Sequence, residues 1–298
     1  MTVYCVIPVH NRVEETEMVL QCLEAQDYLK LRTIVVDDGS TDGTADTVQQ
    51  QYPEVHLLAG GGNLWWAGAM HRGLTYILSQ ASEDDYVLFQ NNDTQFQPDY
   101  VRTLVEVSRA HGNAVVGSIL KDVVDKNRIV SLGPRIDYWR TRIEEVYTAT
   151  VDSSGTIEKG ADREQSQMPE VVEMDALSGR GTLYPRAVFR RVGSVRHRLL
   201  PHYMADYEIA IRAKHAGFRT VVSTRAVVWT GREVSGIDPK RASTTARLLG
   251  RKSRSNILDT IMFFSLCGPA HLRVSAPARV VLYRMWGAAR RRLIGCVS

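Results

Sequence analysis

Long hydrophobic runs are absent from this 298-residue sequence. No stretch approaches the roughly 18 uninterrupted apolar residues that a membrane-spanning helix needs. No basic segment precedes the first apolar residues, Val3 to Ile7, as it would in a secretory signal. We therefore expect a cytoplasmic protein.

Cysteine is scarce and widely spaced. The four residues, Cys5, Cys22, Cys267 and Cys296, form no CxxC pair, which argues against a zinc site and, in the cytoplasm, against a disulfide framework. Hydrophobic residues make up 44% and charged residues 23% of the chain. These values are close to the globular average and exclude a disordered or fibrous protein. At roughly 150 residues per domain, the length suits two domains or one large domain with an extension.

Charge is unevenly distributed along the chain. Residues 240–298 hold 12 Lys or Arg and a single acid, Asp259, whereas residues 1–239 hold 25 basic and 32 acidic residues. The basic segment also contains apolar clusters at 261–264 and 280–283. Basic amphipathic segments bind anionic membrane surfaces, so we expect a peripheral membrane contact. The alternatives are a helical pair packed on the body with its basic face in solvent, and a nucleic-acid interface. The acidic body and the lack of any RNA or DNA module favour no nucleic acid.

Short apolar runs alternate with helical patterns in the first 123 residues. The runs predict strands, and the segments between them predict helices with one apolar face. Strict alternation predicts an α/β fold, with a mostly parallel sheet covered by helices on both faces. Strands are expected at 3–9, 31–36, 55–58, 86–90 and 114–120, and helices at 13–26, from 44, at 67–79 and at 98–109.

The pattern weakens between about residues 124 and 169, where polar and turn-forming residues indicate an inserted hairpin or a mobile loop. Order returns at 171–177, and a helix is expected from Asp206 to His215, ended by Gly217 in a left-handed conformation. The chain is thus divided into a body, residues 1–239, made of the halves 1–123 and 124–239, the second with a mobile loop near 140–170, and a basic amphipathic helical extension, residues 240–298.

Polar clusters follow the predicted strands at the edge where α/β sheets bind ligands. Asp37 and Asp38 follow the second strand, where a carboxylate can accept hydrogen bonds from a base or a ribose. The alternative is an Asx turn. Asp93, which closes the segment Asn91-Asn92-Asp93-Thr94, suits a hard divalent cation that prefers oxygen ligands. The alternative is a turn that only ends the strand.

A third acidic cluster lies in the segment around residue 206. Asp206 at a helix start is either an N-cap or a general base that takes a proton from an attacking hydroxyl. Glu208 and Arg212 have the spacing of an ordinary i,i+4 ion pair.

The order of these clusters resembles the family-2 glycosyltransferases of the GT-A fold. The resemblance runs from Val6 to about Trp229, which is three-quarters of the chain. Each motif alone is weak, but several in family order are hard to meet by chance. The motifs are residues 7–12 (Ile-Pro-Val-His-Asn-Arg), 36–44, 62–68, 91–94 (Asn-Asn-Asp-Thr), 177–179 and 206–208 with Arg212.

The resemblance implies a role for each matching residue. Asp37 would read a pyrimidine base, and Asp93, in place of the family's DxD motif, would hold Mg²⁺ or Mn²⁺ on a diphosphate. Asp206 falls where the family keeps its catalytic base. The donor-binding residues would be Pro8, His10, Arg12, Asp37, Asn63, Trp65, Gly68, Asn92 and Asp93, and the acceptor-side residues Gly179 and Glu208.

The resemblance also implies a reaction. An inverting transferase would move a sugar from a nucleotide-diphosphate donor, a deoxythymidine-diphosphate or UDP sugar, to a hydroxyl of a cell-envelope glycan or a lipid-linked acceptor, at the inner face of the membrane. Members that read Asn-Asn-Asp-Thr include users of deoxythymidine-diphosphate rhamnose, which favours such a donor. Where the family has a metal-binding His, this chain has Trp229 and Thr230. Either Asp93 holds the ion with diphosphate oxygens and water, or Arg232 or an arginine of the extension replaces it.

Two other readings stay open at this point. One is a non-catalytic nucleotide-sugar or glycan-binding protein, against which an intact Asp206 argues. The other is a nucleotidyltransferase, against which the lack of a Gly-rich stretch with partner Arg and Lys argues. Whether the chain forms a homodimer is left open.

Overall fold

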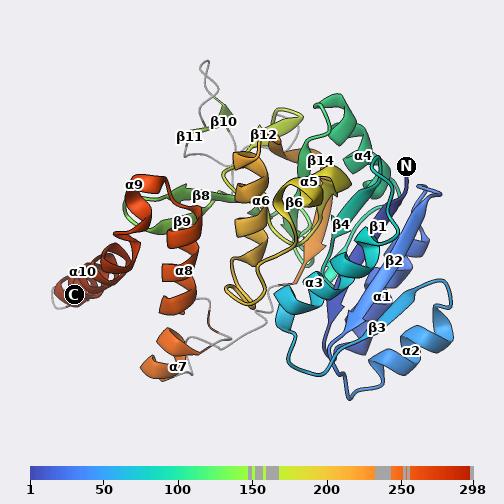
Figure 1. Cartoon of the computed structure of the whole chain (residues 1–298), viewed down its shortest axis with the longest axis horizontal. Coiled ribbons are helices and arrows are strands. Elements are labelled where there is room, and N and C mark those ends of the chain that lie inside the picture. The colour runs from blue at the N-terminus through green and yellow to red at the C-terminus, as the bar shows by residue number, and fades with distance from the viewer. Residues whose placement is uncertain are drawn as a thin grey trace.

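The computed structural model describes residues 1–146, 150–151, 157–158, 168–231, 243–250, 253 and 256–295. At its centre lies a sheet with helices on both faces (Figure 1). The strands follow the order β12-β14-β6-β13-β4-β1-β2-β3, and the long strands pair in parallel. The predicted α/β class is therefore confirmed.

Four parallel strands form the part of the sheet that the sequence pattern predicts best. Val9 is in register with Asp37, and Asp37 with Ala59, so three of the strands end level with one another. The polar residues that follow them therefore gather at one edge. The strands are β1 (Val3–Val9), β2 (Leu31–Asp37), β3 (His56–Ala59) and β4 (Tyr86–Phe89).

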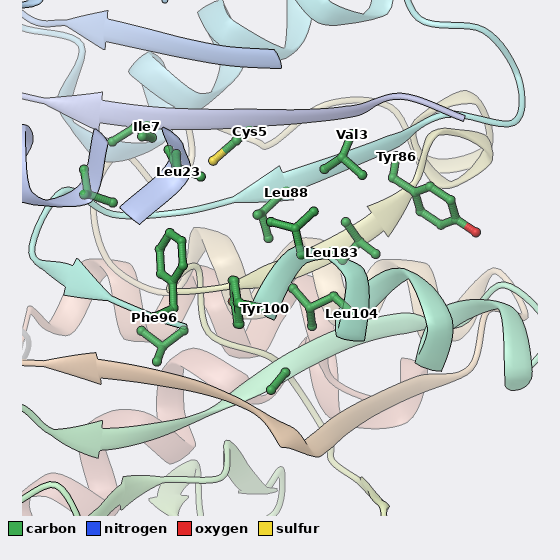
Figure 2. Close-up of a cluster of buried hydrophobic side chains, with 14 of the residues drawn as sticks. Val3, Cys5, Ile7, Leu23, Tyr86, Leu88, Phe96, Tyr100, Leu104 and Leu183 are labelled. Carbon is green, nitrogen blue, oxygen red and sulfur yellow. The ribbon is translucent and has the colours of Figure 1, made fainter. Parts of the chain in front are cut away.

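Alternation along β1 divides the core between two faces of the sheet. Val3, Cys5 and Ile7 pack under two helices on one face (Figure 2). Tyr4 and Val6 point to the other face, where a third helix lies. Each fully buried aliphatic side chain contributes about 1.5–3 kcal/mol, which fixes both layers. The helices of this half are α1 (Val13–Glu24) and α4 (Tyr100–Ala110) on the first face, α3 (Trp65–Leu78) on the second, and α2 (Thr44–Gln51) beside α1 and β3.

The other half of the sheet is mixed in direction. β14 pairs in parallel with β6, whereas β13 lies antiparallel between β4 and β6. Strict alternation of strand and helix does not predict this antiparallel insertion. The strands are β5 (Thr94–Gln95), β6 (Val115–Asp122), β7 (Ile129–Ser131), β12 (Val171–Glu173), β13 (Thr182–Pro185) and β14 (Thr220–Thr230).

The segment after β6 contains the hairpin that its composition indicates. β8 (Pro134–Asp137) pairs with β9 (Arg142–Glu145), and a second short pair joins β10 (Thr150–Val151) to β11 (Ile157–Glu158). The other residues of 147–167, where the mobile loop is expected, lie outside the described part of the chain.

Two helices of the second half pack on the α3 face of the sheet. They are α5 (Arg186–Val192) and α6 (Ala205–His215). α6 ends as expected, since Gly217 has a φ of 93°, a conformation that favours glycine.

The basic extension folds into helices that pack on the body (Figure 1). α8 lies against α6, and α10 lies against α8. Phe263 and Phe264 of α8 are buried with Ile211 of α6 and Val280 of α10. The alternative of a packed helical extension thus describes this part of the molecule. Among the residues placed in the structure, no helix is long and apolar enough to cross a membrane. The helices are α7 (Thr244–Leu249), α8 (Ile257–Cys267), α9 (Ala270–Arg273) and α10 (Ala276–Gly295).

Candidate active site

The turns after β1 and β2 are joined by hydrogen bonds at the carboxyl edge of the sheet. The backbone N–H of Asn11 donates to Oγ of Ser40 (2.7 Å), and Oδ1 of Asn11 accepts from the N–H of Thr41 (2.9 Å). Asn11 and Arg12 have positive φ values of 60° and 66°, which turn the chain sharply from β1 into α1. Arg12 is thereby held at the edge where ligands of α/β sheets bind.

Pro8 and His10 lie at the same edge. Pro8 is in register with Val36 near the end of β1. Nδ1 of His10 lies 2.7 Å from the carbonyl oxygen of Asp38, and its side chain is otherwise exposed. These two residues and Arg12 thus lie at the same edge of the sheet, and their donor-binding role stays a prediction.

The two adjacent aspartates at the end of β2, Asp37 and Asp38, bind different partners. Asp38 accepts hydrogen bonds from the backbone N–H groups of Gly62 (2.7 Å), Leu64 (2.8 Å) and Trp65 (3.1 Å). Asp37 accepts from the N–H of Ser40 at 3.2 Å and from its hydroxyl. Asp38 therefore fixes the glycine loop to β2, a function that the sequence alone does not distinguish from that of Asp37.

The glycine loop after β3 packs tightly on this edge. A Cβ on Gly60 would lie 2.9 Å from Cα of Asp38, and Gly62 has a φ of 84°. Close approach and a left-handed backbone both require glycine here. Asn63 is exposed in this loop.

Trp65 and Gly68 lie in the first turns of α3. The Trp65 ring meets the ring of His202 edge-on, with centroids 5.8 Å apart. Gly68 is buried, and a Cβ there would lie 3.3 Å from Cβ of Leu64. Its backbone N–H donates to the carbonyl oxygen of Leu64 (3.0 Å).

The three side chains of the Asn91-Asn92-Asp93 triplet point to three different partners. Oδ1 of Asn91 accepts from the indole N–H of Trp66 (2.9 Å), and Nδ2 of Asn92 donates to Oγ1 of Thr16 (3.2 Å). Oδ2 of Asp93 lies 3.8 Å from Nη2 of Arg180. The Asn at the first position thus anchors an α3 tryptophan and leaves Asp93 as the carboxylate of the triplet.

Asp93 borders a cavity of about 160 Å³, and only one of its two carboxylate oxygens, Oδ2, has a partner among the described residues. The side chains of Asp93 and Arg180 are 14% and 18% exposed. Oδ1 of Asp93 is buried and has no hydrogen-bond partner among the described residues. The cavity brings together three of the predicted donor residues, Arg12, Asn92 and Asp93. Its lining is completed by Glu15, Met18, Gln95, Val123, Trp229 and Gly231.

The residues around Asp93 fit a cation that takes few of its ligands from the protein. In the described ranges no group of three or more His, Cys, Asp or Glu gathers in a metal-binding arrangement. The free oxygen of Asp93 suits a hard cation that takes its remaining oxygens from a diphosphate and water, as Mg²⁺ does in many phosphate sites. Trp229 belongs to β14, in register with Gln95. Arg232, the alternative counter-charge, lies outside the described residues, and Arg180 stands beside Asp93 instead.

Arg180 is a residue that the motif analysis missed. It follows Gly179 in the loop before β13, and Gly181 after it has a φ of 85°. The signal available in the sequence was a basic residue between two glycines, next to the acceptor-side motif. The antiparallel insertion of β13 beside β4 brings this loop to the Asp93 edge, and that insertion was not predicted.

Asp206 faces the same loop from the start of α6. Oδ2 accepts from the backbone N–H of Gly179 (2.8 Å), and Oδ1 accepts from the N–H of Tyr207 (3.0 Å). The cap residue of α6 is Met204, with a φ of 67°, so the N-cap interpretation of Asp206 is wrong. Burial raises the pKa of Asp206, the two backbone hydrogen bonds oppose this rise, and the charge of Glu145 adds to it.

Trp66 connects the Asp93 side of the site to the Asp206 side. Its indole N–H is bound to Asn91, and its ring fills the space beside Gly179, where a Cβ would overlap the ring. The same Cβ would lie 3.3 Å from Cβ of Asp206. Asp206 therefore contacts Gly179, and Asp93 contacts the next residue of the same loop, Arg180.

A carboxylate of the β8–β9 hairpin completes this side of the site. The hydroxyl of Tyr207 donates to Oε1 of Glu145 (2.7 Å), and the hydroxyl of Ser131 donates to Oε2. Burial raises the pKa of Tyr207, and the charge of Glu145 raises it further. Glu145 was not singled out in the sequence, because no local motif marks a residue that lies 61 positions before Asp206.

Glu208 lies on the opposite side of α6 from Asp206. Two residues along a helix correspond to a rotation of about 200°. Its carboxylate is 2% exposed and is bound by Arg212 at 2.8 Å and Arg196 at 3.4 Å. The expected i,i+4 ion pair is thus present, and the acceptor-side role of Glu208 stays a prediction.

The fold and the polar edge define a GT-A glycosyltransferase, and comparison with known proteins agrees. Residues 4–158, more than half of the chain, match "Glycosyl transferase family 2". The chain belongs to this family and is a glycosyltransferase. It is 27% identical to an N-acetylglucosaminyl-diphospho-decaprenol L-rhamnosyltransferase of Mycobacterium tuberculosis over an alignment of 229 positions, which covers 69% of this chain and 68% of the relative.

Solved structures share the fold at low sequence identity. The mannosyltransferase PcManGT from Pyrobaculum calidifontis, determined with GDP-Man and Mn²⁺, aligns with a TM-score of 0.53 and 18% identity. That alignment covers 99% of this chain and 79% of PcManGT. GalNAc-T7, determined with UDP, GalNAc and Mn²⁺, aligns with a TM-score of 0.60 and 12% identity, covering 78% of this chain and 44% of GalNAc-T7. This chain therefore spans less than half the length of GalNAc-T7.

Proposed function

We propose that this enzyme inverts the anomeric configuration as it transfers a sugar from a nucleotide-diphosphate donor to an acceptor hydroxyl, with Asp206 as the general base. One observation carries the proposal. The carboxylate of Asp206 is held on the N–H of Gly179 at 2.8 Å, and the next residue, Arg180, is paired with Asp93. The proposed base and the proposed diphosphate site thus contact successive residues of one loop, Asp206 through the backbone of Gly179 and Asp93 through the side chain of Arg180.

The chemistry follows from these positions. Asp206 takes the proton of the acceptor hydroxyl while that oxygen attacks the anomeric carbon, a contribution of about 10²–10⁴ in rate. The hydrogen bonds from Gly179 and Tyr207 keep the carboxylate in one orientation. Arg180 and Arg12 offer positive charge where the leaving nucleoside diphosphate becomes more negative. A single displacement on the face opposite the leaving group inverts the configuration.

A divalent cation is part of the proposal. Asp93 would hold Mg²⁺ or Mn²⁺, and the ion would neutralise charge on the donor diphosphate. Asn92 beside it would contribute to donor binding through its amide. The Mn²⁺ recorded with two structural neighbours supports this assignment.

For the substrates, we propose deoxythymidine-diphosphate rhamnose as the donor and a lipid-linked or cell-envelope glycan as the acceptor. The Asn-Asn-Asp-Thr motif and the 27% identity to a rhamnosyltransferase support the donor. The name of that relative, which acts on a diphospho-decaprenol, supports the acceptor class. Thermal unfolding with UDP-, GDP- and deoxythymidine-diphosphate sugars tests the donor, because a ligand at 100 times its Kd adds about 2.7 kcal/mol of stability.

A lipid-linked acceptor calls for contact with a membrane, and α10 offers a surface for it. Ala276 and Val280 face inward and are buried, while the opposite side of the helix exposes an apolar band, the α10 stripe. No acidic residue follows Asp259 in the sequence. An apolar stripe on an extension of net positive charge suits the anionic inner face of a membrane. The stripe consists of Val281, Leu282, Met285 and Trp286.

Replacing the proposed base tests the mechanism. We expect Asp206→Asn to keep donor affinity within about twofold and to lose transfer by about 10²–10⁴-fold, since the amide cannot accept a proton. Asp46→Asn, an exposed carboxylate in the first turn of α2, is the matched control and should turn over normally. Normal transfer by Asp206→Asn would remove Asp206 as the base.

A further inference from the structure

A second, larger cavity lies on the side of α6 that faces away from Asp206. Its volume is about 310 Å³, at the lower end of the range for small-molecule sites. It is an open cavity bordered by α6, the end of α8, Arg273 of α9 and Arg196 from the loop before α6. The lining residues are Arg196, Glu208, Ile211, Arg212, His215, Ser265, Leu266, Cys267 and Arg273.

Positive charge exceeds negative charge in this cavity. Three arginines and His215 line it, against the single carboxylate of Glu208. Glu208 is bound by Arg212 at 2.8 Å and Arg196 at 3.4 Å, so one negative charge is shared between two guanidiniums. Arg212 is further held by the carbonyl oxygens of Val192 and Ser194. Arg273 adds a third positive charge with no carboxylate partner among the described residues.

Several hydrogen-bond donors of the cavity are available. Nε of Arg273 donates to the carbonyl oxygen of Gly268 (2.6 Å), and its two terminal nitrogens have no partner in the described ranges. The hydroxyl of Ser265 and the ring of His215 are likewise without partners in that part of the chain. Burial and the charge of Glu208 raise the pKa of the buried Cys267 thiol, and the three guanidiniums oppose this rise, which agrees with all four charged groups facing one cavity.

We propose that this cavity binds an anion of the phosphate class, a phosphomonoester or a diphosphate, between α6 and the helical extension. Arginine forks and a neighbouring hydroxyl are the donors that phosphate oxygens match best. Because α6 also carries Asp206, and α8 and α9 belong to the extension, the bound anion ties the helix of the proposed base to the extension. The same chemistry is presented by a lipid headgroup and by a soluble phosphate.

Calorimetric titration with inorganic pyrophosphate tests the site without donor or acceptor. Pyrophosphate also meets the Asp93 edge, so the titrations are done in an Arg180→Gln background. We expect Arg273→Gln to weaken pyrophosphate affinity at least tenfold. Arg32→Gln removes the same charge at the exposed start of β2, where Arg32 lines neither cavity, and should change affinity less than twofold.

A second substitution protects the test against misfolding. Thermal unfolding without ligand identifies a damaged variant, and Ser265→Ala, which removes one donor and no charge, should weaken the same binding about threefold to tenfold. Equal pyrophosphate affinity in the parent, Arg273→Gln and Ser265→Ala would overturn the proposal. So would equal weakening by Arg273→Gln and Arg32→Gln, which would reduce the effect to net charge.

The source of the phosphate is separated by two further arms. Sedimentation with phosphatidylcholine vesicles containing phosphatidic acid, compared with phosphatidylcholine alone, tests a lipid headgroup, and inorganic phosphate tests a soluble anion. If Arg273→Gln weakens binding only to phosphatidic acid vesicles, the lipid source is supported. If it weakens binding only to inorganic phosphate, the soluble source is supported. No deficit in either arm contradicts the proposal. Because none of these readouts needs transfer, the result is independent of Asp206.

Discussion

Arg180 and Asp93 form an ion pair, with Nη2 and Oδ2 3.8 Å apart, at the border of the cavity that also contains Arg12. The second oxygen of Asp93 is buried and has no partner among the described residues. A carboxylate with one oxygen near a guanidinium and the other available is suited to sharing a diphosphate with that guanidinium. We therefore expect donor binding to depend on Arg180 as well as on the Asn-Asn-Asp triplet.

Removing the charge of Arg180 is expected to slow transfer. Arg180→Gln should lower kcat by about 10²–10³, because a positive charge aimed at a developing negative charge acts mainly in the transition state. Steady-state kinetics with Arg180→Lys as the charge-retaining variant and Arg32→Gln as the surface control measure this effect. A kcat within threefold of wild type for Arg180→Gln would show that Arg180 does not act on the leaving group.

The raised pKa of Asp206 predicts an acid limb in the pH profile. Below this pKa the carboxyl is protonated and cannot accept the hydroxyl proton, so kcat should fall toward low pH, from a higher pH than an aspartate of ordinary pKa would give. The fall is measured as log kcat against pH, with Asp206→Glu as a variant that shifts the limb. An acid limb that is unmoved in Asp206→Glu would assign it to another group.

The same pKa shift predicts an effect on stability. A carboxyl whose pKa is higher in the folded state than in the unfolded state costs stability once pH rises above its unfolded pKa. Asp206→Asn should therefore unfold at a higher urea concentration than wild type at pH 7. The difference should disappear as pH falls below the ordinary aspartate range, where both states are protonated. A variant that is less stable than wild type at pH 7 would contradict the direction of the shift.

Asp38 is predicted to hold the glycine loop after β3 in place. Asp38→Ala removes three hydrogen bonds to Gly62, Leu64 and Trp65, and it should lower the free energy of unfolding by about 2–3 kcal/mol. Urea unfolding measures the loss as a lower midpoint at unchanged slope. Asp46→Ala, on the exposed side of α2, should stay within about 0.5 kcal/mol of wild type. Equal midpoints for the two variants would show that the loop is held by other contacts.

The α10 stripe is predicted to bind anionic vesicles. Leu282→Ser combined with Met285→Ser should reduce sedimentation with phosphatidylglycerol vesicles at least fivefold, because Leu282 is 63% and Met285 65% exposed. Binding by wild type should weaken as salt rises. Leu29→Ser, a change at a 98% exposed leucine of the body, is the control. Equal sedimentation of the double variant and the control would locate membrane contact elsewhere.

The first half of the fold was predictable because local patterns and spatial neighbours coincide there. β1 was predicted at its observed bounds, and α1, β2 and β4 to within two residues, since each apolar run matches one period. β13 was not predicted, because four residues inserted antiparallel have no periodicity that distinguishes them from a loop.

The candidate site was predictable where a polar or charged residue directly follows a predicted strand, because the strand end alone then fixes its position. Arg12, Asn92 and Asp93 border one cavity, as their places after β1 and β4 indicated. The partnerships of Arg180 and Glu145 arise from the placement of β13 and of the β8–β9 hairpin, which no local motif encodes. The different partners of Asp37 and Asp38 depend on a one-residue change of direction in a turn.

Trp66 contacts both the Asn91 triplet and the Gly179 loop, and so links the two sides of the candidate site. Its indole N–H donates a hydrogen bond to Asn91 of the triplet after β4. Its ring limits how closely Gly179 can approach α3, and Gly179 in turn binds the carboxylate of Asp206. A side chain at position 179 displaces the indole or the base. A change at residue 66 would therefore alter the proposed donor site and the orientation of the proposed base together, because both depend on one rigid ring.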